Sequence, residues 1–248
     1  MEPLYQQDLA YIQAAAFGTL AQGAAPEIIR RLKGAAVPVQ RVVDAGCGAG
    51  TLSAALAEAG FAVTGIDSSA ELLAIAQSAA PRAKFVHGSI YETPLPQCEA
   101  IVALGEPLTY HTEGADADAL VATFFRVASA VLPVGGMLIF DVIERGGPSL
   151  AGRYWSSGED WAVLAVTEED QNSRTLLRTI ETFRRVDQLY RRGCEVHRVR
   201  LFDTTTLRDQ LAACGFATET AQAYGAQPLG PRRQAFFAMR RGDSEKVE

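Results

Sequence analysis

VVDAGCGAGTLS, at residues 42–53, is the stretch that decides the fold. Its first residues end an apolar run that predicts a buried strand, which Asp44 closes. Gly46, Gly48 and Gly50 then form a tight turn into the apolar pattern of a helix. Glycine allows positive φ and lets a ligand approach the backbone without meeting a Cβ atom. The N-terminus of the helix adds unpaired N–H groups and positive potential, which favour a bound carboxylate or phosphate.

The spacing of the glycines separates two nucleotide-type cofactors. The dinucleotide fingerprint is G-x-G-x-x-G, whereas this chain has G-x-G-x-G, with Thr51 where the third glycine would fall. From Asp44 to Gly50 the segment resembles the E/D-x-G-x-G-x-G motif of class I methyltransferases, which bind S-adenosylmethionine (SAM) and release S-adenosylhomocysteine. The resemblance implies that the motif residues bind SAM: Asp44, Ala45, Gly46, Cys47, Gly48 and Gly50.

Composition indicates an ordinary globular protein that acts on a small molecule. The chain has 248 residues, 48% of them hydrophobic, so it can bury a large core. Its formal net charge is −6 and its basic residues are scattered, which argues against a nucleic-acid partner. We expect no membrane partner, no signal peptide, a cytoplasmic location, and a monomer or homodimer. The four cysteines and three histidines lack metal-ligand spacing, so no metal site is expected.

Strands and helices alternate through the first two thirds of the chain. Nearly continuous apolar strands suit a parallel sheet that is covered on both faces. The alternation predicts a doubly wound α/β fold. The expected elements are a strand at 41–45, a helix at 51–59, a strand at 62–67, a helix at 70–79, strands at 84–88 and 99–104, a helix at 116–132 and a strand at 136–142.

The sequence pattern then changes. Residues 143–160 are rich in Gly, Ser and Pro, and three strand-like runs follow that suggest antiparallel hairpins. A helix ending at Gly215 and strands near 216–223 and 235–240 close the chain. This order resembles a class I methyltransferase with a β-rich substrate cap. We therefore expect one domain with a mostly parallel, seven-stranded, Rossmann-like sheet and an antiparallel β insertion. Its expected parts are a helical lid at 1–33, broken at Gly23 to Pro26, a SAM-binding core at 34–142 and 203–241, and the cap at 143–202.

Asp67 ends the second expected strand, about 20 residues beyond the glycine turn, where an acid can accept both ribose hydroxyls. Its alternative role is a helix N-cap, for which Ser68 is the better candidate. The resemblance places Ser68 among the cofactor contacts as well. It also implies that Ser89 bonds the adenine through its hydroxyl or its backbone N–H, and that Ile90 packs on the ring.

Further cofactor contacts are expected after the fourth strand and in the N-terminal segment. By the same resemblance, the Leu104 carbonyl receives the SAM ammonium group, and Gly105 allows it to pass closely. Tyr11, Phe17 and Gly18 are expected to fold over the cofactor. For Phe17, a core contact of a surface helix is an equally good interpretation.

Three polar residues follow the fourth strand, at the sheet edge where doubly wound folds bind ligands. Glu106, Tyr110 and His111 are therefore the catalytic candidates, with Glu106 either a base or substrate anchor, or a capping or surface carboxylate. In the insertion, side-chain alternation puts Glu195 and His197 on one strand face. They are either substrate contacts or a solvent-facing salt pair. Trp155 is either an apolar wall of the substrate site or a hairpin packing residue.

The sequence thus predicts a SAM-dependent methyltransferase that modifies a nitrogen or oxygen atom of a small molecule. Two alternatives stay open. An NAD(P)-dependent oxidoreductase is possible if the glycine spacing misleads, although Thr51 counts against it. A SAM-binding regulator without catalysis would use the same glycine turn, so this motif does not distinguish it from an enzyme.

Overall fold

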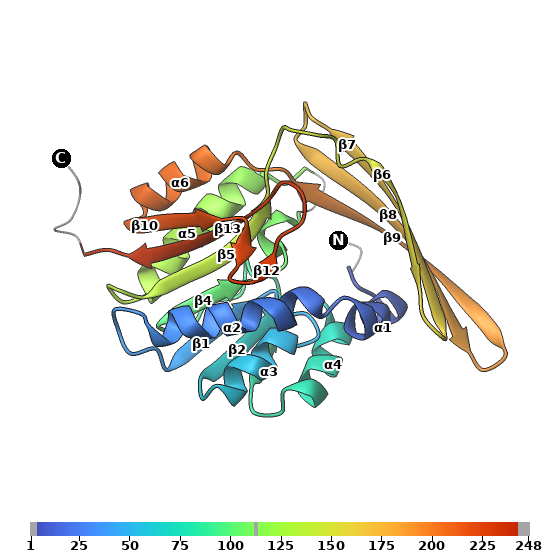
Figure 1. Cartoon of the computed structure of the whole chain (residues 1–248), viewed down its shortest axis with the longest axis horizontal. Helices are drawn as coiled ribbons and strands as arrows, with labels where there is room; N and C mark the ends of the chain where they lie inside the picture. The colour runs from blue at the N-terminus through green and yellow to red at the C-terminus, as the bar shows by residue number, and fades with distance from the viewer. Residues whose placement is uncertain (1–3, 112–113, 243–248) are drawn as a thin grey trace.

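A computed structural model describes residues 4–111 and 114–242 of the chain. A seven-stranded sheet carries helices on both faces, and a separate four-stranded sheet extends from one end of it (Figure 1). In the described part of the chain, no helix is both long and apolar enough to cross a membrane. The predicted doubly wound α/β fold with an antiparallel insertion is confirmed.

The large sheet has the strand order β10-β13-β5-β4-β1-β2-β3. Its first five strands in chain order pair in parallel, whereas β13 and β10 pair antiparallel. The chain runs outward from β1 through β2 to β3 and then returns to β4 on the other side of β1. Between β1 and β4 lies the switch point at which such sheets bind ligands. The strands are β1 (Arg41–Ala45), β2 (Ala62–Asp67), β3 (Lys84–His87), β4 (Ala100–Ala103), β5 (Met137–Ile143), β10 (Phe216–Ala221) and β13 (Arg233–Arg240).

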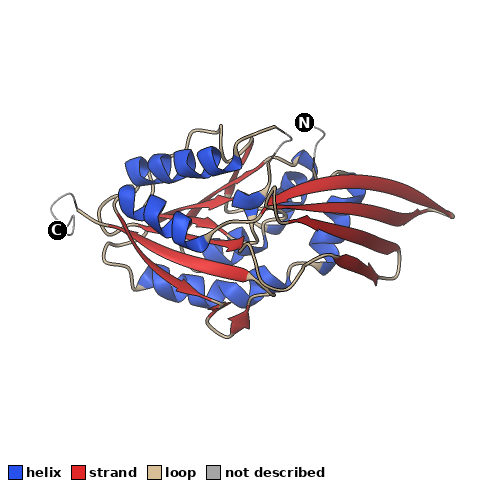
Figure 2. Cartoon of the chain, turned by 90° about the horizontal axis from the view of Figure 1, so that it is seen from above, coloured by secondary structure: helices blue, strands red, loops and turns tan. Residues whose placement is uncertain are grey.

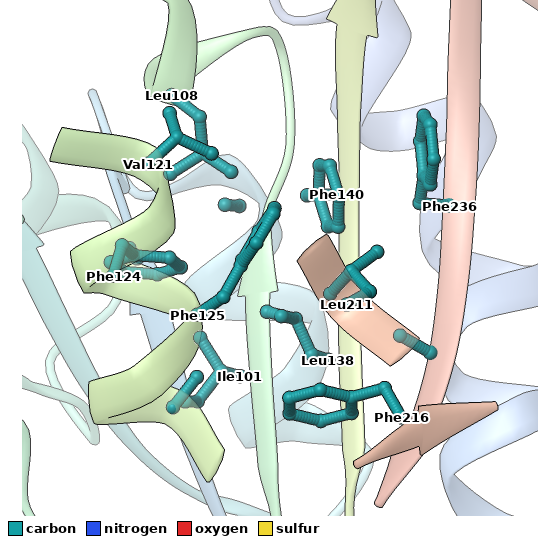
Figure 3. Close-up of a cluster of buried hydrophobic side chains, with 14 of the residues drawn as sticks. Ile101, Leu108, Val121, Phe124, Phe125, Leu138, Phe140, Leu211, Phe216 and Phe236 are labelled. Carbon is teal, nitrogen blue, oxygen red and sulfur yellow. The ribbon is translucent and has the colours of Figure 1, made fainter. Parts of the chain in front are cut away.

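Two buried apolar clusters hold the helices against the two faces of this sheet. On one face, the ring of Phe125 contacts those of Phe124 and Phe140, and Phe140 stacks on Phe236 with a centroid separation of 4.7 Å (Figure 3). The other cluster includes residues of α2 and α3. The helices are α1 (Gln7–Ala16), α2 (Thr19–Lys33), α3 (Thr51–Glu58), α4 (Ala70–Ala79), α5 (Ala117–Val131) and α6 (Thr204–Ala213).

The smaller sheet, here called the cap, consists of four antiparallel strands that project well beyond the body (Figure 2). Three strand-like runs were expected here, and the structure adds a fourth, because the Gly- and Ser-containing segment 152–157 pairs with its neighbour at the sheet edge. Its weak apolar pattern gives little strand signal. The cap strands are β6 (Gly152–Ser157), β7 (Trp161–Asp170), β8 (Thr175–Val186) and β9 (Leu189–Arg200).

The break in the N-terminal helical segment lies at Phe17 and Gly18, and the expected break at Gly23 to Pro26 is wrong. Helix α2 continues through Pro26, although proline removes one helical hydrogen bond. Burial of the α2 face that carries Ile28 outweighs this loss, because packing supplies most helical stability in proteins. A short hairpin, β11 (Ala223–Tyr224) and β12 (Gln227–Pro228), packs on the same helix and had no clear sequence signal.

Candidate functional site

A cavity of about 420 Å³ opens at the carboxyl ends of β1, β2 and β4, at the switch point of the sheet. Loops after four strands and the segment before α2 contribute to its wall. Its polar and conformationally special residues include Tyr5, Gln13, Gly18, Asp44, Gly46, Cys47, Gly48, Thr51, Asp67, Ser68, Ser89, Tyr91, Glu92, Gly105, Tyr110 and His111. The described wall contains no lysine or arginine.

The first two glycines of the turn serve different purposes. Both have positive φ, +75° at Gly46 and +53° at Gly48. A Cβ atom at Gly46 would lie 2.4 Å from Cβ of Pro107, so glycine there lets the loop after β4 pack closely. A Cβ atom at Gly48 would have no neighbour within 4 Å. The backbone at Gly48 therefore faces open space that a ligand can enter.

Two motif residues face the protein interior instead. A Cβ atom at Gly50 would lie 2.9 Å from Cβ of Ala76, so this glycine lets α3 approach α4. Ala45 is completely buried in the core. Neither is among the described wall residues, and their expected contacts with the cofactor stay predictions. The methyl group of Ala45 packs in the core, and the absence of a side chain at Gly50 lets two helices pack closely.

Asp44 is a buried carboxyl in the cavity wall. Its Oδ2 accepts a hydrogen bond of 2.6 Å from the Ser53 hydroxyl. Burial raises the pKa of Asp44 to about 7, because desolvation disfavours the charged form more than the Ser53 bond favours it. A cationic ligand in the cavity would favour the ionised form.

Asp67 supports the glycine turn from the end of β2. It accepts hydrogen bonds from the backbone N–H of Gly48, at 2.8 Å, and of Ser69, at 2.9 Å. Burial raises its pKa, and these bonds oppose the rise. The N-cap of α4 is Ser69, whose hydroxyl accepts from the Leu72 N–H, so neither Asp67 nor Ser68 is the cap. Asp67 and Ser68 both lie in the cavity wall.

The expected adenine and methionine contacts also line the cavity. The Ser89 hydroxyl accepts a hydrogen bond from the Tyr91 N–H at 3.2 Å, and Ile90 packs against the core. Leu104 and Gly105 form the wall after β4, where the Gly105 N–H donates to Asp141 at 2.8 Å. Burial, partly offset by Arg233, raises the pKa of Asp141 to about 6.

The N-terminal segment closes one side of the cavity. Phe17 and Gly18 are in its wall, so Phe17 is more than a core contact. Tyr11 is not among the described wall residues, because its hydroxyl donates to Asp160 at 3.0 Å and its ring lies 3.7 Å from the Arg184 guanidinium. It therefore joins α1 to the cap, and its expected contact with the cofactor stays a prediction.

Glu106 is buried between two arginines and is absent from the described cavity wall. Its Oε1 accepts from Arg178 of β8 at 2.6 Å, and Oε2 lies 2.7 Å from Nη2 of Arg233 on β13. Burial alone would raise the pKa of Glu106, but the two guanidinium groups hold it below its ordinary value. A general base must reach the substrate proton, whereas this carboxylate is held by two arginines. Neither a surface nor a capping carboxylate describes it.

Tyr110 and His111 do line the cavity. Their backbone runs beside β9. Tyr110 forms an isolated antiparallel β-bridge with Val199, and the His111 N–H donates to the Arg198 carbonyl at 3.4 Å. The Tyr110 hydroxyl lies 3.0 Å from the hydroxyl of Tyr5. Burial raises the pKa of both phenols, so both stay protonated at neutral pH. Tyr5 had no sequence signal, because it precedes the first helix and carries no motif.

The three expected cap contacts occupy different places. Glu195 and His197 are buried and lie 2.9 Å apart, so the solvent-facing interpretation is wrong. Neither is in the described cavity wall; both stand behind Tyr5, whose ring centroid lies 5.0 Å from that of His197. Trp155 is 73% exposed and, by strand register, lies on the cap face opposite to Glu195. This placement sets Trp155 apart from the described cavity wall, and its expected role in the substrate site stays a prediction.

Residues 42–130 match the family model of a methyltransferase domain, which includes the glycine turn and Asp67. This match makes residues 42–130 a methyltransferase domain, and the chain resembles class I SAM-dependent methyltransferases in its fold. SAM is its cofactor, so the nicotinamide alternative is set aside. The cavity fits SAM, because the cofactor is cationic and the wall combines an open backbone at Gly48 with the carboxyls of Asp44 and Asp67.

Similar proteins support this assignment. YqeM of Bacillus subtilis (strain 168), a provisionally named methyltransferase, is 28% identical over 209 residues, covering 79% of this chain and 82% of that protein. A SAM-dependent methyltransferase from Clostridium acetobutylicum ATCC 824 has a TM-score of 0.79 at 16% identity, covering 94% of this chain and 96% of the other. The sugar N-methyltransferase KedS8 from Streptoalloteichus sp ATCC 53650 has a TM-score of 0.75 at 22% identity, covering 95% and 92%. At these identities the two solved structures show a shared fold.

The described residues contain no group of three or more His, Cys, Asp or Glu side chains placed to hold a metal ion. Cys47 lies in the cavity wall, and burial raises the pKa of its thiol well above the ordinary value. It is therefore a neutral, apolar neighbour of the glycine turn.

Proposed function

We propose that this methyltransferase transfers the methyl group of SAM to a nitrogen or oxygen atom of a small molecule bound beside Tyr5, Tyr110 and His111. The observation that carries the proposal is that these three polar side chains share one cavity with the glycine turn. Methyl transfer is an in-line displacement, and two ligands held in one water-poor cavity gain much of their rate from orientation.

The cofactor half of the cavity is proposed from the wall residues. Asp67 would accept the ribose hydroxyls, as acids at the end of the second strand do in such folds. Ser89 and Ile90 would contact the adenine, and Leu104 and Gly105 would border the methionine part. Asp44, whose pKa is raised to about 7, would become ionised beside the cationic cofactor.

The acceptor half would use His111 as the proton acceptor. Its imidazole is in the cavity wall, and an imidazole ring nitrogen can accept a proton in general base catalysis. The protonated phenols of Tyr5 and Tyr110 would orient the acceptor through hydrogen bonds. Glu106, ionised and held by two arginines, would fix the loop that carries Tyr110 and His111 rather than remove a proton.

The charge of the wall favours an amine over an acid as the acceptor. The described wall carries Asp44, Asp67 and Glu92 but neither lysine nor arginine. A carboxylate or phosphate buried there would lack a counter-ion and lose much of its hydration energy. The name of one similar structure, a sugar N-methyltransferase, agrees with an amine acceptor.

A labelled-methyl assay tests this function. The protein is incubated with methyl-labelled SAM and a panel of small amines, phenols and carboxylic acids, and products are identified by mass spectrometry. We expect label on an amine or hydroxyl, and much less label with His111→Ala. Label on carboxylic acids alone would contradict the preference for an amine acceptor, and label on protein or RNA with no small-molecule product would overturn the proposal.

A further inference from the structure

One carboxylate of the cap binds the first described residues of the N-terminal segment that closes the cavity. Glu195 of β9 accepts hydrogen bonds from two successive backbone N–H groups, those of Tyr5 at 2.7 Å and Gln6 at 2.9 Å. These bonds join residues 190 and 189 positions apart in the sequence. Bonds to an ionised acceptor are stronger than bonds between neutral groups. Glu195 is therefore well placed to hold this stretch of backbone.

The backbone that Glu195 holds has an uncommon conformation. Tyr5 has φ of +53°, in the left-handed region that costs energy for a residue with a Cβ atom. The same residue is attached to the core, because its carbonyl accepts from the Ser69 hydroxyl at 2.8 Å. With both sides fixed, the phenol of Tyr5 reaches the cavity and meets the hydroxyl of Tyr110.

Two neighbouring features support the position of Glu195. His197, two residues along the same strand face, is buried and places Nε2 2.9 Å from Glu195 Oε2. Further along the segment, Asp8 forms a two-bond contact with Arg191 of β9, at 2.6 and 2.5 Å. In Figure 1, α1 lies beside the cap and the described N-terminal residues lie between the cap and the body.

We propose that Glu195 is a positioning residue that holds the N-terminal segment, residues 4–18, over the bound cofactor. Leu4, Tyr5, Phe17 and Gly18 line the same cavity as the glycine turn, so SAM placed there lies beneath this segment. Release of the cofactor then requires the bonds from Tyr5 and Gln6 to Glu195 to break. The inference rests on the proposed placement of SAM in this cavity.

Glu195→Gln tests this role. Glutamine keeps one oxygen acceptor but turns an N–H₂ group toward a backbone N–H, so one bond is lost and a repulsion is added. We expect the dissociation rate of S-adenosylhomocysteine to rise about tenfold, the scale of one bond to a charged group. The rate of backbone amide hydrogen exchange in residues 5–16 should rise as well, while the exchange rates in the large sheet stay at the wild-type level.

Glu181→Gln is the matched control, because Glu181 lies on the outer face of the same cap and pairs with the exposed Arg192. It should leave both measurements unchanged. If Glu195→Gln fails to fold, Arg191→Met breaks the second contact between segment and cap and should also speed dissociation. If folded Glu195→Gln releases S-adenosylhomocysteine and exchanges its amide hydrogens at the wild-type rates, the proposal is overturned. If Glu195→Gln does not fold, the same result in Arg191→Met overturns it.

These outcomes are separate from those of the methylation assay. If the wild type binds S-adenosylhomocysteine and Glu195→Gln releases it faster, the positioning role stands whatever acceptor the panel reveals. If methylation proceeds but Glu195→Gln behaves as wild type, the proposed function stands and the positioning role fails. Wild-type protein that does not bind S-adenosylhomocysteine would overturn the positioning role.

Discussion

Glu106 and Arg178 form a buried ion pair, 2.6 Å from Oε1 to Nη1, that joins the loop after β4 to the cap strand β8. The same carboxylate lies 2.7 Å from Arg233 on β13. One acidic side chain therefore connects the loop after β4, the cap and the large sheet. Removing one partner of a buried pair is costly, because it leaves a charge incompletely compensated.

Arg178→Met should lower the free energy of unfolding by about 3 kcal/mol, the lower range for loss of one partner of a buried pair, since Arg233 still faces Glu106. Urea denaturation of the wild type and the variant measures this. Arg192→Met is the control, because Arg192 pairs with Glu181 at the exposed cap surface and should show no measurable change. Equal losses in both variants would contradict the role of the buried pair.

The pH dependence of stability should follow from the same pair. The folded-state pKa of Glu106 lies below its unfolded value, so its contribution is present above that unfolded value, about 4.3. It is lost as pH falls through the folded pKa. Glu106→Gln should therefore reduce the loss of stability on acidification. Urea unfolding midpoints of the wild type and Glu106→Gln, measured from neutral to acidic pH, test this. The same dependence of the midpoint on pH in both proteins would count against it.

Much of the large sheet could be predicted from sequence, because its strands have clear local sequence patterns. The strands at 41–45 and 62–67 have apolar runs bounded by turn residues, so their observed limits agree with prediction. The edge strand β6 lacks such a pattern, and α2 continues through Pro26 because its buried face packs on distant elements. Local pattern does not contain that tertiary information.

The cofactor side of the site was also more predictable than the acceptor side. Gly48 and Asp67 belong to one short motif and meet within one strand–turn–helix unit. The surroundings of Glu106 depend on Arg178, 72 positions away, and those of Tyr5 depend on Glu195, 190 positions away. No spacing rule connects such residues, so their pairing emerged only from the three-dimensional arrangement.

Substitution of Gly48 should mainly weaken SAM binding, whereas substitution of Gly50 should mainly lower stability. Gly48→Ala should cost about 1 to 2 kcal/mol of stability for its positive φ, but it should strongly weaken SAM binding, because the new methyl enters open cavity space. Gly50→Ala should cost more stability, since its methyl would press on Ala76. Thermal unfolding and calorimetric titration with SAM separate the two effects. Greater loss of SAM binding in Gly50→Ala would contradict this division.

Binding of SAM should depend on pH through Asp44. The pKa of this carboxyl is raised to about 7 without ligand, and a cationic cofactor lowers it, so binding releases a proton. The affinity for SAM should rise about tenfold from pH 6 to pH 8 and then level off. Titration calorimetry in buffers of different ionisation enthalpy detects the proton. Asp44→Asn should remove the dependence; the same pH profile in that variant would assign it to another group.

His111 should affect the chemical step more than cofactor binding. If its imidazole accepts the proton of the acceptor, His111→Ala should reduce kcat by about 10²- to 10⁴-fold, the usual range for general base catalysis. SAM affinity should change little, because the cofactor contacts are proposed at other wall residues. His87→Ala is the matched control, since His87 is exposed at the end of β3 and its ring contacts the Ser68 carbonyl. Steady-state kinetics with the acceptor found in the methylation panel decides the role. An unchanged kcat in His111→Ala would mean that orientation alone drives transfer, with the Tyr5 and Tyr110 hydroxyls as the next groups to test.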